Sequence, residues 1–310
     1  MDGYVNVTYL TLGGHVHLLK YRYLYFLITL ALFVLIVCSN AVIFSLICVH
    51  KSLHEPMYIF IAALLLNALL GSAALYPKLL IDLLSANQTI SYPACVFQGF
   101  LLYVYAASEF TLLSAMAYDR YVSICRPLRY HAFIRTHTVK LILILAWLLP
   151  VCEVGGAAVM TSRLKLCRFT LARIVCDNFS LVKLSCGDLR MNNLYGLLIM
   201  VIAIFPPVIF ILFSYMRIFT ICLRRSKDFR AGALQTCLPH LFIFGIFTII
   251  SLFEVIQNRL PSDMPHIFRV AMSIQYLVIP PLFNPLIYGF KMREISQQLR
   301  ALFRLKQVVR

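Results

Sequence analysis

The sequence predicts an all-α membrane protein: a bundle of seven transmembrane helices followed by a short amphipathic C-terminal helix. Composition is the first reason. Hydrophobic residues make up 61% of the 310 residues and charged residues only 13%, against about 45–50% and about 25% in an average soluble domain. So few charges cannot cover a water-facing surface. The second reason is that the apolar residues form runs of roughly the 20 residues that a helix needs to cross a bilayer.

Seven such runs follow one another, each bounded by charged or turn-forming residues. They cover residues 23–49, 57–84, 94–118, 139–160, 194–223, 238–257 and 267–289. Prolines inside several runs are acceptable in a membrane, where neighbouring helices and water satisfy the freed backbone groups. Continuous runs exclude a β-barrel, whose strands alternate in hydrophobicity over about ten residues. No internal repeat is visible, which disfavours transporters built from duplicated halves.

The tail at residues 290–310 differs from the seven runs. Its apolar residues recur at helical spacing and its basic residues take the other face, a pattern typical of helices that lie in the membrane interface and attract anionic lipid. The apolar set is Phe290, Ile295, Leu299, Leu302 and Phe303, and the basic set is Arg293, Arg300, Arg304 and Lys306. Membrane lipid is therefore an expected partner.

The distribution of charge predicts the orientation of the chain. With residues 1–22 outside, 17 of the 28 Lys and Arg residues fall in the inner loops and tail, as the positive-inside rule requires. The chain is then a single domain, residues 1–310, in the plasma membrane, with one long outer loop at 161–193. No cleavable signal peptide is expected, because no apolar core precedes a cleavage site. We therefore interpret the net charge of +16 as a sign of contact with the inner membrane surface and not of nucleic-acid binding.

Sequons and cysteines agree with this orientation. Three glycosylation sequons, at Asn6, Asn87 and Asn178, all fall outside in the same arrangement. Four of the ten cysteines also lie outside, where disulfides persist, and four cysteines allow three pairings. These four are Cys95, Cys167, Cys176 and Cys186.

Short motifs stand at the ends of several runs. The third run ends in MAYDRY at residues 116–121, followed by Ile124 and Cys125. The second begins with PMY at 56–58, the seventh ends in NPLIY at 284–288, and TCLPHL at 236–241 opens the sixth. An acid beside an arginine at the end of a membrane helix is costly unless the two are paired or solvated, so the third-run motif needs a functional reason.

Together these motifs resemble those of the odorant (olfactory) receptors, a branch of the rhodopsin-like G-protein-coupled receptors, in a form similar to fish receptors. The resemblance covers nearly the whole chain and includes the cysteines of the long loop. It implies two disulfides, Cys95–Cys176 and Cys167–Cys186. It also implies that Asp119 holds Arg120 at rest and that Arg120 is released to a G protein on activation. The positions of the activation switch are Asp119, Arg120, Tyr121, Tyr215, His240, Asn284, Pro285 and Tyr288.

The sequence departs from the family pattern at a predicted ion site. Many rhodopsin-like receptors carry an Asp in the middle of the second helix, where this chain has Ala68, with Asn67 one position earlier. Glu109 does match the family's acid in the third helix. Three roles stay open for it: a lone sodium ligand, a protonated carboxyl, or a partner for Asn67. No other metal or cofactor is expected.

The resemblance places a ligand pocket in the outer half of the bundle, among the third, fifth, sixth and seventh helices. The matching positions are mostly apolar, as small-molecule sites tend to be: Tyr103, Ala106, Ala107, Ile199, Ala203, Thr248, Ser251 and Val255. Two acids, Glu153 and Glu254, also lie in outer halves of apolar runs, where a charge needs a reason. Leu102 occupies the neighbourhood where amine receptors keep an acid on the third helix, which disfavours a biogenic-amine receptor.

The predicted function is that of an odorant receptor, which binds a small molecule from outside and activates a stimulatory, olfactory-type G protein to raise cAMP. A receptor of the same family that detects a metabolite outside olfaction is the alternative, and a channel or transporter is a weaker one. An enzyme is not expected, because the chain has no phosphate-binding glycine loop, no H-E-x-x-H and no other catalytic constellation.

Overall fold

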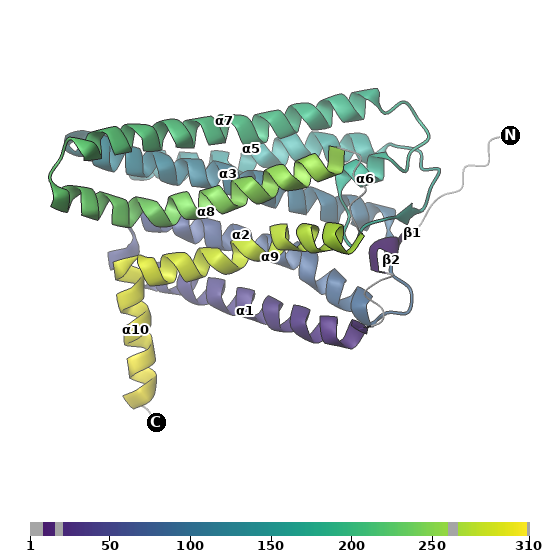
Figure 1. The fold of residues 1–310 in the computed structure, drawn as a ribbon, viewed down its shortest axis with the longest axis horizontal. Coiled ribbons are helices and arrows are strands. Elements are labelled where there is room, and N and C mark those ends of the chain that lie inside the picture. The colour runs from purple at the N-terminus through teal and green to yellow at the C-terminus, as the bar shows by residue number, and fades with distance from the viewer. Residues whose placement is uncertain (1–8, 16–20, 260–265, 309–310) are drawn as a thin grey trace.

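The computed structural model describes residues 9–15, 21–259 and 266–308, and these form an elongated bundle of antiparallel helices (Figure 1). Within these described residues, six helices are long and apolar enough to cross a membrane. They are α1 (Arg22–Val49), α2 (Pro56–Leu84), α3 (Tyr92–Cys125), α5 (Thr136–Ser162), α7 (Arg190–Leu223) and α8 (Lys227–Arg259). The seventh predicted run is α9 (His266–Lys291), and α10 (Arg293–Val308) follows it. The predicted seven-transmembrane bundle with a short C-terminal helix is confirmed.

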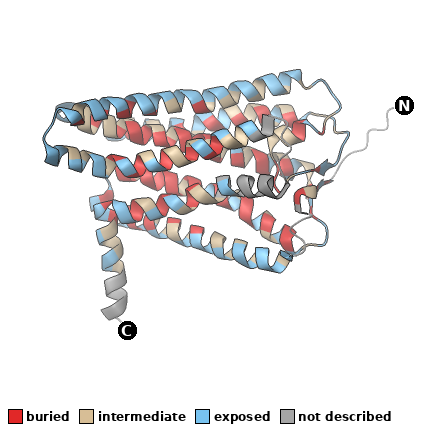
Figure 2. Ribbon diagram, in the orientation of Figure 1, coloured by how far each residue is buried: buried red, intermediate tan, exposed pale blue. Residues whose placement is uncertain are grey.

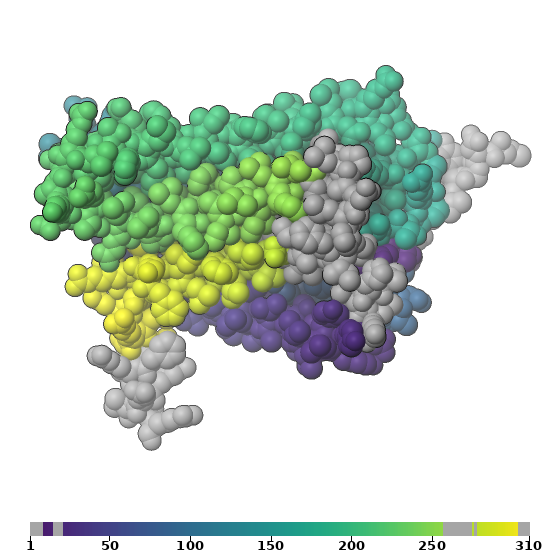
Figure 3. Space-filling model, viewed as in Figure 1, coloured from purple at the N-terminus to yellow at the C-terminus, as the bar shows by residue number. Residues whose placement is uncertain are grey.

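Burial divides the helices into inner and outer members (Figure 2). Most of the apolar stretch of α2 and α3 is buried, whereas little of that of α5 and α7 is. Large apolar side chains exposed in this way suit a lipid environment and would be an aggregation hazard in water. Those on α7 include Leu198, Phe205, Ile209, Phe213 and Phe219. Figure 3 shows the side chains of α7, α8, α9 and α1 filling one long face in turn.

One end of the bundle carries a small β-sheet, and we call it the sheet end. Strand β1 (Tyr9–Leu12) lies between β2 (Thr89–Ser91), to which it is antiparallel, and β3 (Thr170–Leu171), to which it is parallel. Leu10 and Leu12 point inward and are buried, while Tyr9 is exposed, as expected for a strand whose side chains alternate between two faces. From the sequence this segment was expected only as part of the outer N-terminus, residues 1–22, and no strand was predicted there.

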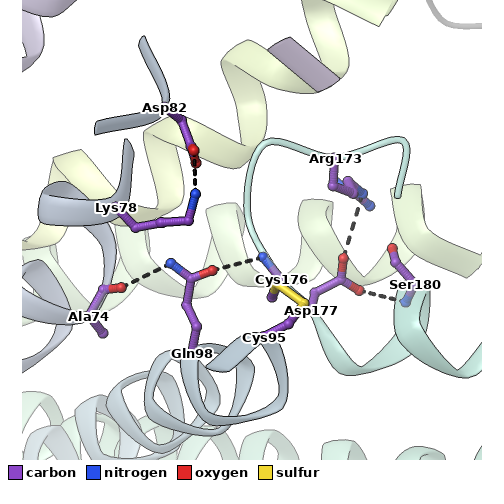
Figure 4. Close-up of a disulfide and its surroundings, with 9 residues drawn as sticks. All are labelled: Ala74, Lys78, Asp82, Cys95, Gln98, Arg173, Cys176, Asp177 and Ser180. Atoms are coloured by element: carbon purple, nitrogen blue, oxygen red, sulfur yellow. Dashed lines mark hydrogen bonds and ion pairs between the residues drawn. A yellow bond between two sulfur atoms is a disulfide. The ribbon is translucent and has the colours of Figure 1, made fainter. Parts of the chain in front are cut away.

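The long loop between α5 and α7 folds over the sheet end, and two disulfides hold it. Cys95 at the start of α3 pairs with Cys176, and Cys167 pairs with Cys186, the pairings that the resemblance implied. Gln98 adds a link between three segments (Figure 4): its Nε2 donates to the Ala74 carbonyl of α2 at 3.0 Å, and its Oε1 accepts from the Cys176 amide at 3.1 Å. The loop also forms the short helix α6 (Asn178–Val182).

The opposite end, which we call the α10 end, carries the short helix α4 (Tyr130–Phe133) and the tail helix. Figure 1 shows α10 turning away from the bundle axis. Ile295 of α10 is buried, but Phe290, which precedes it, is largely exposed. A hydrogen bond of 2.6 Å from the Tyr58 hydroxyl to Glu294 joins the start of α2 to α10. The side chains of Phe303, Arg304 and Lys306 lie outside the described part of the chain.

The contact between the loop and the short turn at Gly13–His15, which follows β1, gives a first prediction. A Cβ added at Gly14 would lie 2.6 Å from the Ile174 amide nitrogen and 2.8 Å from the Arg173 carbonyl oxygen, closer than real Cβ atoms approach backbone. We expect Gly14→Ala to destabilise the folded receptor by about 1–3 kcal/mol, the usual cost of overpacking, and to lower the melting temperature of the purified protein. Gly245→Ala, where an added Cβ meets nothing within 4 Å, is the control. Equal melting temperatures for both variants would contradict the prediction.

Candidate functional site

A buried carboxylate joins three helices at the middle of the bundle. Glu109 of α3 is fully buried. Its Oε2 accepts a hydrogen bond of 2.9 Å from Asn67 Nδ2 of α2, and its Oε1 accepts one of 2.8 Å from Asn284 Nδ2 of α9. Asn67 Nδ2 also donates to the Tyr105 carbonyl at 3.0 Å. Of the three roles left open for Glu109, the structure contains the partnership with Asn67, and it adds Asn284, which sequence analysis had placed only in the switch.

A third asparagine, which the sequence analysis did not single out, ties α1 to the same region. Asn40 is fully buried, and its Nδ2 donates to the carbonyls of Ile36 and Pro281, both at 2.8 Å. The bond to Pro281 crosses from α1 to α9. The signal was present in the sequence, because Asn40 stands in the middle of the first apolar run, where an unpaired amide would be costly.

At the α10 end, the predicted pair Asp119 and Arg120 forms a closed contact. Arg120 Nε donates to Asp119 Oδ2 at 3.0 Å, and the Tyr130 hydroxyl of α4 donates to Asp119 Oδ1 at 2.7 Å. Both carboxylate oxygens therefore have partners, and Asp119 is fully buried. Burial, then the charge of Asp119 and the hydrogen bond to it, raise the pKa of Tyr130 above its ordinary value. The phenol therefore remains a donor, a contribution from α4 that sequence analysis did not foresee.

Tyr215 and His240 form a second buried contact nearby. The His240 Nε2 lies 2.9 Å from the Leu113 carbonyl oxygen, and its Nδ1 lies 2.6 Å from the Tyr215 hydroxyl. Because a carbonyl can only accept, Nε2 carries the proton and Nδ1 accepts from the tyrosine. This contact joins α7, α8 and α3.

The remaining switch residues pack in the core. Tyr288 is fully buried, with its hydroxyl 3.9 Å from the Met116 sulfur. Pro285 is buried within α9, and Tyr121 is partly buried against the main hydrophobic core.

A cavity of about 230 Å³ opens toward the sheet end, between α3, α5, α7, α8 and the long loop. Seven of the eight predicted pocket residues line it; Thr248 does not, and Phe110 and Ile204 line the deeper part instead. The seven are Tyr103, Ala106, Ala107, Ile199, Ala203, Ser251 and Val255. The long loop also lines the cavity, through Arg173, Val175 and residues 176–179. This contribution was not predicted from the sequence.

The two acids singled out in the sequence, Glu254 and Glu153, lie in different places relative to the cavity. Glu254 lines the cavity, and its Oε1 lies 3.4 Å from Nη1 of Arg173. Glu153 does not line it; its backbone carbonyl accepts a hydrogen bond of 3.2 Å from the Tyr195 hydroxyl. Only Glu254 is therefore placed to meet a molecule in the cavity.

The known proteins that this chain resembles are olfactory receptors. The sequence model of the family described as "Olfactory receptor" matches residues 29–306. The chain is 33% identical to human Olfactory receptor 52A5 over 284 residues, which cover 90% of this chain and 89% of the relative. It is 34% identical to human Olfactory receptor 51E1 over 278 residues, covering 88% and 86% of the two chains. Human Olfactory receptor 6N1 is 33% identical over 295 residues, covering 93% and 92%.

The buried carboxylate gives a second prediction. Glu109→Leu would leave the amides of Asn67 and Asn284 without this acceptor, at a cost of about 1–3 kcal/mol for each unsatisfied group. We therefore expect a clear fall in the melting temperature of the purified receptor. The double variant Glu109→Leu/Asn67→Leu should lose less than the sum of the two single losses, because both partners of one contact are gone. Strictly additive losses would show that the two side chains do not interact.

Proposed function

Because this chain belongs to the olfactory receptor family of G-protein-coupled receptors, we propose that it binds a small odorant in the cavity at the sheet end and activates a stimulatory, olfactory-type G protein at the α10 end, raising cAMP. Members of this family are receptors and not enzymes, and the chain is a multi-pass membrane protein. A channel or transporter finds no support in the family. A receptor of the same family that detects a metabolite outside olfaction would use the same cavity, and its tissue of expression would separate it from an odorant receptor.

The observation that carries this proposal is the position of α3. One helix lines the cavity with Tyr103 and Ala107, holds Glu109 in the middle and ends in the Asp119–Arg120 pair. A molecule in the cavity therefore touches the same rigid element that presents Arg120 at the far end. Such a molecule shifts the equilibrium only by binding the active arrangement more tightly than the resting one.

The contacts at the α10 end support a resting arrangement. Arg120 is engaged by Asp119, and Tyr215 is engaged by His240. We propose that activation breaks both contacts. Arg120 then becomes available to the G protein, and Tyr215 moves with Tyr288 into the space beside it.

We propose that the sheet end faces the outside and the α10 end the cytoplasm. Both disulfides lie at the sheet end, and disulfides persist in oxidising surroundings. Most of the basic residues fall in the loops and tail of the other end.

A sodium ion beside Glu109 remains a proposal of its own. The donor set is suitable for a hard cation, which prefers oxygen ligands: the Glu109 carboxylate is accompanied by Asn284 Oδ1, a buried oxygen with no hydrogen-bond partner among the described residues. Both carboxylate oxygens already accept an amide proton, and each retains a further lone pair. Glu109 and Asn284 would hold the ion, which would supply a positive charge to the buried carboxylate.

A third prediction concerns Arg120. In cells that express the full chain with a stimulatory G protein, we expect Arg120→Ala to abolish the rise in cAMP produced by an odorant panel, while surface expression persists. Arg135→Ala, which removes an exposed arginine at the same end, is the matched control and should keep the response. An ionic current without a change in cAMP would overturn the receptor proposal.

A fourth prediction tests the orientation. Asn87 is exposed between α2 and β2, whereas Asn178 lines the cavity and its Oδ1 accepts a hydrogen bond of 2.5 Å from Thr161. Asn6 lies outside the described residues. We expect Asn87→Gln to remove a glycan, seen as a gel shift that a glycosidase reproduces, and Asn178→Gln to remove none. Loss of a glycan in Asn178→Gln would contradict this placement of the loop.

A further inference from the structure

The charge around the cavity is confined to its rim. Among the residues described as lining it, only Arg173, Asp177 and Glu254 are charged. Arg173 and Asp177 belong to the long loop, and Glu254 belongs to α8. The deeper lining is apolar, with Phe110, Ile204 and neighbouring residues. A ligand of this cavity therefore meets hydrocarbon at one end and charge at the other.

The three charged side chains touch each other through long contacts. Arg173 Nη1 lies 3.4 Å from Glu254 Oε1, and Arg173 Nε lies 3.8 Å from Asp177 Oδ2. Their side chains are 14% (Arg173), 17% (Asp177) and 22% (Glu254) exposed, so water screens them only partly. Two carboxylates thus share one guanidinium in a partly buried place.

Asp177 is held in position and has one oxygen to spare. Its Oδ1 accepts a hydrogen bond of 2.8 Å from the Ser180 amide and so caps α6, as Figure 4 shows. The neighbouring Cys176 is fixed to α3 by its disulfide. Apart from the long ion pair with Arg173, no described residue gives the buried Asp177 Oδ2 a hydrogen bond, and a buried polar atom without a hydrogen bond costs free energy. A donor from a molecule in the cavity would recover that cost.

Charge and hydrogen bonding point to the same kind of ligand. An ammonium group has three donors and a positive charge, and both acids would attract it. A carboxylate would instead enter beside two negative charges and compete with them for Arg173. A neutral alcohol supplies a donor but brings no positive charge to the two acids among the described lining residues.

We propose that this receptor recognises organic cations, namely protonated amines on a compact hydrocarbon body, with the nitrogen between Asp177 and Glu254 and the hydrocarbon against the apolar lining. This inference takes the cavity as the ligand site and so rests on the proposed function. It differs from recognition by an acid on the third helix, where this chain has Leu102, because the acids come from the loop and α8. The ammonium would link the disulfide-anchored loop to α8.

Binding to the purified full-length receptor tests this inference directly. The probes are hexylamine, cyclohexylamine and benzylamine, each with the alcohol and the carboxylate of the same hydrocarbon, at pH 7, where the amines are protonated. We expect the amines to raise the melting temperature at lower concentrations than their neutral or anionic counterparts. Asp177→Asn, which keeps a good helix cap, and Glu254→Gln should each weaken amine binding by about tenfold or more. Glu153→Gln, which removes an acid outside the cavity, is the matched control and should change nothing.

The outcomes separate this inference from the proposed function. Amine binding that depends on Asp177 and Glu254, without any rise in cAMP in cells, would support the inference and count against the proposed signalling. A receptor that signals to neutral odorants while no amine binds would do the opposite. Tighter binding of the alcohol or carboxylate than of its amine, or equal amine binding in Asp177→Asn, Glu254→Gln and Glu153→Gln, would overturn the inference.

Discussion

The arrangement of this receptor depends on one buried carboxylate. Glu109 lies among apolar helices, where an isolated acid is expensive, and it is accommodated because α2 and α9 each bring an asparagine amide to one of its oxygens. The requirement fixes the register of three helices at once, because a shift of one residue in any of them would turn its polar group away. Asn40 extends the constraint to α1 through the Pro281 carbonyl. The cavity and the α10 end are therefore built on a framework held at its centre.

Between Glu109 and the α10 end, two buried polar contacts limit the helices to a few discrete arrangements. Asp119 has partners for both oxygens in Arg120 and Tyr130, and His240 has partners for both nitrogens in Tyr215 and Leu113. Each set joins α3 to a different element, namely α4 on one side and α7 with α8 on the other. Because buried polar groups cannot be left half-satisfied cheaply, the helices must separate far enough for new partners or water to replace the old ones. This favours two discrete states.

Much of the fold and of the cavity could be predicted from the sequence. The features that were missed all depend on contacts between segments that lie far apart in the sequence. The seven apolar runs depend on local composition, so their helices appear where expected, and the switch motifs are short and local. Strand β1 was missed because four residues with alternating side chains mean little without the partners at 89–91 and 170–171. The lining contributed by Arg173 and Asp177 was missed for the same reason. The disulfide implied for Cys176 placed the loop over α3, but no pattern in the loop showed which side chains face inward.

At the sheet end, a cross-linked loop and helix α8 face the same cavity, and this arrangement bears on how a ligand acts. The loop is fixed by two disulfides, by Gln98 and by β1, and it meets the cavity together with α3. On α8, Ser251, Glu254 and Val255 face the same cavity, and the far half of that helix holds His240. Only contacts that differ between the resting and active states change the equilibrium, so under the proposed function a ligand activates the receptor through those contacts with α3 or α8 that differ between the two states.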